Sequence, residues 1–285
     1  MKPSGIIRTA FSVLPETTAP DGDTLLKLSY IVFYIVYWVD KMKSEDSRLQ
    51  LLDCFDIDIS RKELAAGINA RGNRDQILDR AARVLLTVQG CWRPRAVVRR
   101  LLVERVTDSG MVTLRPLDQG EAGTLALGFA GKFMAAADQG LVAVFTAGDE
   151  LEREAAIASK EKRIMDAYLC DLIGLTVLEK VRRQINRIIE EQARARNWGV
   201  SPFLSPGSVH GWELGDQDNL CNFVPIEKIG VTRGKNGILK PFKTISCLVG
   251  IGPGYTARTV GETCDVCSKR EQCSVRLREE EKTIS

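Results

Sequence analysis

Histidine is almost absent from this sequence: His210 is the only one in 285 residues. Catalytic triads, zinc hydrolase sites with two or three histidines and two-histidine iron sites are therefore not expected. Neither charge sign dominates, since 40 Lys and Arg against 37 Asp and Glu leave a net charge of +3. A chain this close to neutral is not expected to bind nucleic acid through a broad basic surface.

Long apolar segments are also missing. The hydrophobic run from Leu28 to Val39 is about half the roughly 20 residues that a membrane-spanning helix needs. Its β-branched and aromatic residues favour a strand, with an anchor in the membrane interface as the alternative. Residues 1–20 lack the basic start and apolar block of a secretory signal. The eight cysteines are mostly scattered, so we expect a cytoplasmic protein with no membrane partner.

Changes in composition divide the chain into three parts. Residues 1–50 form an N-terminal extension whose structure the sequence does not specify. Residues 51–255 carry regular helix and strand patterns and are numerous enough to bury a core. Residues 256–285 form a tail that contains three of the cysteines.

Regular patterns begin near Leu51. Ser60 and Glu63 have the spacing of a capping box, which predicts a helix start after an expected strand at 53–59. Asp108-Ser109-Gly110 predicts the turn of a hairpin. The other expected elements are a helix over 73–90, hairpin strands at 96–106 and 111–117, a short helix at 133–137, a strand at 141–145, a helix over 216–223 and strands near 229–231 and 244–249. Without regular βαβ alternation, these elements predict an α+β fold with a mainly antiparallel sheet.

The longest helical region is expected over 151–196. Its apolar residues recur at helical spacing and predict a face buried in the core. They are Ile164, Tyr168, Leu172, Val177, Val181, Ile185 and Ile188. Gly174 interrupts this pattern, so we expect either a break or a close packing contact there.

The tail contains the spacing Cys264-x2-Cys267-x5-Cys273. Thiolates at this spacing can converge on zinc or a [4Fe–4S] cluster, because a tight turn brings the first two together. Either centre normally takes four protein ligands, and Cys221 and Cys247 are candidates for the fourth. The alternative is a pair of exposed thiols that oxidise or pair with each other on standing.

Three further features have an ordinary interpretation beside a functional one. Ser205-Pro206-Gly207 lies in a long loop and by itself indicates only a turn. Glu179 could receive an amino group or a ribose hydroxyl, or it could be a solvated charge beside cationic neighbours on a helix. His210 could bind a cofactor or be a plain loop residue.

Taken in order, several motifs resemble those of a known family. They are T-A-G at 146–148, D-L-I-G-L-T-V-L-E at 171–179, L-S-P-G-S-V-H-G-W at 204–212, D-Q-D-N-L at 216–220, I-G-V-T at 229–232 and K-P-F-K-T-I-S at 240–246. This succession resembles the reactivation domain of vitamin B12-dependent methionine synthase, in its free-standing form. The resemblance covers roughly residues 52–277 and includes the cysteine tail of several free-standing members.

The resemblance implies a helmet-like α+β domain, with a bent, mainly antiparallel sheet flanked by helices. Such a domain binds S-adenosylmethionine and closes over cobalamin carried by a partner, either a corrinoid-binding protein or a methionine synthase module. An electron donor such as flavodoxin or ferredoxin reduces the cobalt, and the sulfonium methyl then traps it. The implied activity is that of a corrinoid reductive activase or reactivation methyltransferase, with the cysteine tail holding an electron-delivering cluster.

The same resemblance assigns roles to individual residues. Glu179 falls where the family has a carboxylate near the bound cofactor. The backbone of Leu204, Ser205, Pro206 and Gly207 cradles the methionine or adenine portion, and the loop 238–243 faces the corrin.

Two positions depart from the family pattern. Phe203 and Ser208 stand where the family usually carries an Arg and a Tyr. An arginine there is a natural clamp for the methionine carboxylate, and phenylalanine cannot replace it. A second interpretation therefore stays open: a non-catalytic binding module that kept the fold and uses its cysteines as a structural zinc or iron–sulfur clip.

Overall fold

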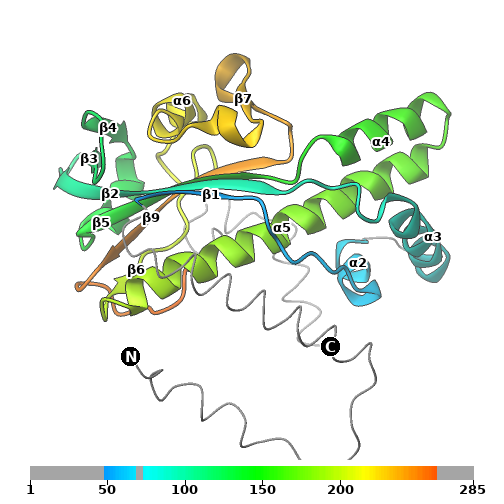
Figure 1. Cartoon of the computed structure of the whole chain (residues 1–285), viewed down its shortest axis with the longest axis horizontal. Helices are drawn as coiled ribbons and strands as arrows, with labels where there is room; N and C mark the ends of the chain where they lie inside the picture. The colour runs from blue at the N-terminus through cyan, green and yellow to red at the C-terminus, as the bar shows by residue number, and fades with distance from the viewer. Residues whose placement is uncertain (1–47, 69–72, 262–285) are drawn as a thin grey trace, which may run out of the picture. The chain divides into compact units, whose positions relative to one another are not determined.

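The computed structural model describes residues 48–68 and 73–261. They form a seven-stranded sheet with one long helix across one face and short elements on the other (Figure 1). The strand order is β4-β3-β2-β5-β9-β6, all neighbours are antiparallel, and β1 pairs with the first half of β2. The strands are β1 (Leu49–Leu52), β2 (Arg95–Val106), β3 (Met111–Pro116), β4 (Gly123–Ala126), β5 (Gln139–Thr146), β6 (Gly199–Val200) and β9 (Thr244–Gly252). The predicted α+β class with a mainly antiparallel sheet is confirmed.

Helices cover both faces of this sheet. Figure 1 shows α5 (Ile164–Arg194) crossing one face, while α6 (Gln217–Cys221) and the two-stranded ribbon of β7 (Thr232–Arg233) and β8 (Leu239–Lys240) lie on the other. The remaining helices are α2 (Arg61–Gly67), α3 (Arg74–Val88) and α4 (Glu150–Lys160), with 3-10 turns η1 (Gly128–Met134), η2 (Leu214–Asp216), η3 (Ile226–Ile229) and η4 (Lys235–Gly237).

The central strand β5 is the most apolar of the sheet. Its last seven residues, from Gly140 to Thr146, are all buried. Val142 pairs with Arg99 of β2 on one side and with Leu248 of β9 on the other. Strands covered on both faces lose the apolar–polar alternation of a half-exposed strand, which explains the uninterrupted run L-V-A-V-F.

Local sequence signals locate several elements correctly. Ser60 accepts a hydrogen bond from the Glu63 amide, and the Glu63 carboxylate accepts one from the Ser60 amide, so the predicted capping box starts α2. The hairpin of β2 and β3 turns at Asp108 and Ser109, as predicted, and the Gly110 amide closes the turn by donating to the Thr107 carbonyl at 2.9 Å. The expected helix over 73–90 is α3.

Other boundaries differ from the predictions. No strand forms at 53–59; the strand lies earlier, at β1. The short helix expected at 133–137 is the 3-10 turn η1, and the strand expected near 229–231 is η3 followed by β7. The region 151–196 is two helices, because the chain turns at Glu161–Arg163, where Lys162 has a φ of 60°.

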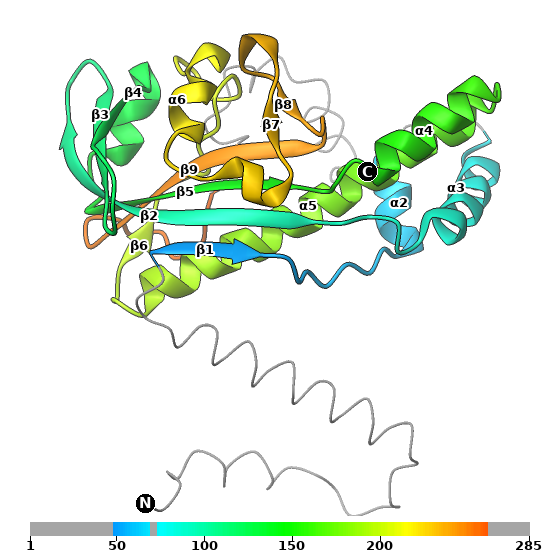
Figure 2. The ribbon, with the colours of Figure 1, turned by 45° about the horizontal axis from the view of Figure 1, so that its top comes forward.

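The predicted apolar face of the long helix is only partly buried. Val177, Val181, Ile185 and Ile188 face the sheet, whereas Ile164 and Tyr168 are 64% and 49% exposed. Figures 1 and 2 show the reason: α4 and the first half of α5 extend beyond the ends of the strands. Gly174 is not a break but a packing contact, since a Cβ there would lie 2.4 Å from Cδ of Lys243.

The apolar run at 28–39 and the three tail cysteines lie outside the described residues. Within the described part of the chain, no helix combines the length and the apolarity that crossing a membrane requires.

Glycines hold the β2–β3 turn against η1. Gly110 has a φ of +81°, and a Cβ added there would lie 1.8 Å from the carbonyl oxygen of Gly128. Gly128 is equally confined, because a Cβ added to it would lie 2.6 Å from the carbonyl oxygen of Gly211. The turn, η1 and the loop after Gly207 therefore meet through backbone.

Gly110→Ala is expected to lower the free energy of unfolding by about 3 kcal/mol or more, because it combines positive-φ strain with a backbone clash. Gly90→Ala is the matched control, since its φ is +78° but nothing lies within 4 Å of the added Cβ. The control is expected to cost about 1 kcal/mol. Urea unfolding of both variants measures the difference, and equal losses would contradict the packing argument.

Candidate functional site

The chain that leaves α5 runs along the outer edge of β9. After β6, the Ser201 amide donates to the Gly250 carbonyl at 2.8 Å, and Leu204 exchanges two backbone hydrogen bonds with Leu248 at 3.1 and 2.9 Å. Ser205 Oγ then donates to the Ser246 carbonyl at 2.8 Å. This edge pairing fixes the position of the loop that contains Ser205, Pro206 and Gly207.

The loop itself is a tight, internally bonded turn. The Ser205 carbonyl accepts hydrogen bonds from the amides of Ser208 and Val209, at 3.1 and 3.3 Å. Gly207 has a φ of +75° and donates its amide to the Trp212 carbonyl at 2.8 Å. Leu204 and Pro206 are buried. The ordinary interpretation of this segment as a turn is therefore correct, and any ligand role is additional to it.

Glu179 lies on α5 and is already bound by two arginines. Its two oxygens accept from Nε and Nη2 of Arg182, at 2.6 and 2.8 Å, and from Nε of Arg183 at 2.9 Å. Partial burial raises the pKa of this carboxyl, but the Arg182 and Arg183 guanidiniums lower it more, so the net pKa lies below its ordinary value. The carboxylate is therefore charged at neutral pH.

Phe203 connects the loop to Glu179. Its ring is buried at 2% exposure, and the guanidinium carbon of Arg182 lies 5.8 Å from the ring centre. The same guanidinium holds Glu179, so the loop and the carboxylate meet through Arg182. The sequence analysis placed Arg182 among the cationic neighbours of Glu179, three residues away at the spacing of a helical ion pair, but did not predict its contact with Phe203.

Lys243 is a second buried cation, and its ion pair was not predicted from the sequence. The Lys243 side chain is 6% exposed, passes over Gly174 and forms an ion pair with Asp171 at 2.7 Å. The Lys243 amide donates to Glu152 Oε1 at 2.8 Å, and its carbonyl accepts from the Ala147 amide at 3.0 Å. Lys243 therefore fastens the segment between β8 and β9 to α4, α5 and the end of β5.

His210 lies on the surface beside η1. Its ring meets that of Phe129 edge-on at 5.5 Å, and Lys132 Nζ lies 3.6 Å from the centre of the Phe129 ring. Phe129 is 56% exposed. The structure thus gives His210 the surroundings of an exposed loop residue.

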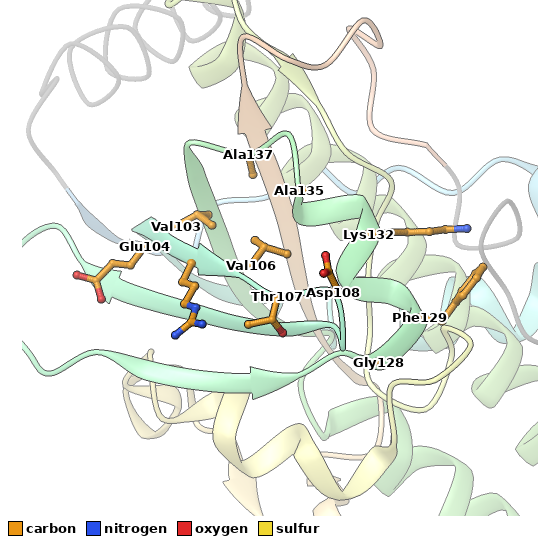
Figure 3. A pocket seen from close by; sticks show the side chains of 11 residues that line it. Val103, Glu104, Val106, Thr107, Asp108, Gly128, Phe129, Lys132, Ala135 and Ala137 are labelled. Atoms are coloured by element: carbon orange, nitrogen blue, oxygen red, sulfur yellow. The ribbon is translucent and has the colours of Figure 1, made fainter.

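Two cavities of the described chain lie away from Glu179 and the loop 204–207. A cavity of about 510 Å³ opens where β2 continues beyond its pairing with β5, lined by β2 residues such as Val103 and Val106 and by η1 (Figure 3). A second, of about 340 Å³, lies between α4 and α5 and is lined by Phe242 and Lys243. Neither is lined by Glu179 or by any of residues 204–207.

The cysteines that the structure describes do not form a metal site. Cys247 is fully buried on β9, and burial raises its pKa to about 12; burial likewise raises the pKa of Cys221 to about 11. Cys221 belongs to the core cluster on the α6 side of the sheet, whereas Cys247 faces α5 next to Arg182. Over residues 48–68 and 73–261, no three His, Cys, Asp or Glu side chains come together as metal ligands.

The fold is similar to that of a solved reactivation domain. A crystal structure of the MetH reactivation domain bound to AdoHcy superposes with a TM-score of 0.53, at 14% sequence identity, over 81% of this chain and 88% of that one. No family model matches the sequence. A search of curated proteins also finds no match. The similarity therefore establishes a shared fold.

Arg182→Ala is expected to lower the free energy of unfolding by about 2 kcal/mol, because it removes a nearly buried cation that joins Glu179 to Phe203. Arg183→Ala removes a guanidinium that is 62% exposed and is expected to cost about 0.5 kcal/mol or less. Urea unfolding compares the two. Equal losses of unfolding free energy in the two variants would show that the contact of Arg182 with Phe203 adds no stability.

Proposed function

We propose that this protein reactivates a corrinoid protein: it binds S-adenosylmethionine and presents the sulfonium methyl to cobalt carried by a partner. The observation that carries the proposal is the fold, which matches a reactivation domain over most of both chains. The ordered motifs at 171–179, 204–212 and 240–246 support it, because the structure places them on α5, on the edge of β9 and at the start of β9.

The residues present suit this cofactor in part. Ser246 Oγ is buried beside the loop and has no hydrogen-bond partner among the described residues, so a polar group remains available there. Glu179 is charged and could hold the amino group or a ribose hydroxyl of the ligand. Arg182, adjacent to Phe203, supplies a guanidinium close to the loop position where the family carries its arginine.

The chemistry couples an unfavourable reduction to a favourable methyl transfer. One electron reduces Co(II) to Co(I); Co(I) then provides the electron pair of the new cobalt–carbon bond. The carbon–sulfur bond breaks, its electron pair stays on sulfur, and S-adenosylhomocysteine leaves. In this scheme the loop and α5 hold the sulfonium in line with cobalt and exclude water.

The cysteine segment is proposed to deliver the electron. It follows Gly261, whose carbonyl accepts the Phe203 amide at 3.1 Å, so the chain enters that segment beside the candidate site. An iron–sulfur cluster on Cys264, Cys267 and Cys273 would supply a one-electron carrier next to the corrinoid.

A binding module without methyl transfer is the second candidate. Two observations favour it: Phe203 is packed into the structure where a carboxylate clamp would be needed, and Arg182 and Arg183 already occupy the oxygens of Glu179. In that case the three cysteines would hold a structural zinc or iron–sulfur clip.

Isothermal titration of the anaerobic protein with S-adenosylmethionine tests the first proposal, with saturable one-to-one binding expected. Glu179→Gln should weaken binding roughly tenfold, because it removes a charge-assisted hydrogen bond. Glu191→Gln, on the same helix, should leave it unchanged. A folded, metal-replete protein without binding would rule out methyl donation and favour the binding module.

Metal and sulfide analysis separates the two roles of the cysteine segment. Iron with acid-labile sulfide and visible absorption is expected for electron delivery, whereas one zinc in a colourless protein would support the clip. Cys267→Ser should lose the bound metal, and Cys54→Ser, at an exposed thiol of the described chain, should retain it. Full retention by Cys267→Ser would remove Cys267 from the ligand set.

A further inference from the structure

The segment from Lys228 to Lys243 is strongly basic. It contains five Lys or Arg residues and no Asp or Glu, in a chain whose charges are otherwise nearly balanced. Elsewhere cations are commonly paired, as Arg80 is with Asp166 and Lys180 with Glu63. Within the segment only Lys243 has such a partner among the described residues.

Residues 231–243 form a two-stranded ribbon that leaves three of these cations exposed. Thr232 pairs with Lys240 and Arg233 with Leu239, and the Gly234 amide donates to the Ile238 carbonyl at 2.6 Å. Val231 and Leu239 are buried and anchor this ribbon to the core. Arg233, Lys235 and Lys240 are exposed, and none forms an ion pair with a residue that the structure describes. We call residues 231–243 the basic ribbon.

A fourth cation extends this surface. Arg95, at the start of β2, is exposed, and its Nη1 lies 3.8 Å from the position that a Cβ at Gly230 would take. Two large apolar side chains of the basic ribbon are also exposed: Ile238 at 44% and Phe242 at 76%. Large apolar side chains exposed in a charged segment are a feature of protein-binding surfaces.

The basic ribbon borders the candidate site. A Cβ at Gly237 would lie 2.7 Å from the Leu214 carbonyl oxygen, and a Cβ at Gly207 would lie 3.3 Å from Leu214 Cβ. Leu214 therefore lies between the loop of Ser205 and the basic ribbon, close to both. A protein that brings its cargo to this loop can therefore contact the ribbon at the same time.

We propose that the basic ribbon docks a protein with an acidic surface, with Arg95, Arg233, Lys235 and Lys240 pairing with its carboxylates and Ile238 and Phe242 as exposed apolar contacts. The identity of that protein as the corrinoid carrier rests on the proposed function. Such surfaces steer association and select partners more than they add affinity. A protein is favoured over two other anionic partners. A nucleic acid would find only one exposed ring on which to stack a base. A membrane would bury less apolar surface on these two side chains than on a single acyl chain, which by itself binds only marginally.

The test uses the full chain and the cobalamin-loaded, cobalamin-binding module of a methionine synthase as the probe. Association rates and Kd values are measured by surface plasmon resonance at low and high salt. Lys235→Glu combined with Lys240→Glu should weaken binding roughly tenfold or more at low salt, mainly through the association rate. Lys62→Glu combined with Lys160→Glu makes the same change in net charge at exposed lysines of α2 and α4, and should change binding less than about twofold.

Equal losses in the two double variants would overturn the proposal, since net charge alone would then explain them. The proposal is also overturned if the unmodified protein does not bind the probe. It is equally overturned if single-stranded DNA or vesicles of anionic lipid bind the ribbon more tightly than the module does. Titration of the same samples with S-adenosylmethionine separates the two proposals. Retained cofactor binding with lost probe binding locates the defect in docking; absent cofactor binding with intact probe binding counts against methyl donation alone.

Discussion

The free edge of β9 is the constraint on which the rest of the candidate site depends. A strand without a full-length neighbour leaves a row of unpaired amides and carbonyls, and the chain has to cover them. Residues 199–205 do so, from β6 to the hydrogen bond between Ser205 and Ser246. The turn at Gly207 comes directly after that pairing, so its position follows from the sheet.

Buried cations then join this edge to the helices. Arg182 lies between Glu179 and Phe203, and Lys243 crosses Gly174 to reach Asp171. Each arrangement takes a cation largely out of water, which stabilises the structure only when the geometry and the remaining hydrogen bonds are good. Both arrangements lie where a loop of functional interest meets α5. They make α5 the element that positions the loop as well as the one that covers the sheet.

Local signals predicted those parts of the fold whose causes are local. The capping box at Ser60, the turn at Gly110 and the apolar run of β5 each depend on a few neighbouring residues. The burial of the apolar face of the long helix was not predicted correctly. Ile164 and Tyr168 have the spacing of core residues, yet they are exposed because that part of α5 lies beyond the sheet. Helical periodicity reports a shared face and cannot report whether another element covers it.

The candidate site divides in the same way. The sequence alone determined the fold class, the motif order that resembles a reactivation domain and the basic character of residues 228–243, because composition and spacing are properties of the chain. Only the tertiary structure decided that Arg182 also lies beside Phe203, that Cys221 and Cys247 are buried on opposite faces of the sheet, and that the basic ribbon borders the loop. These features depend on how segments far apart in the sequence pack, and their geometry is set by the sheet and α5.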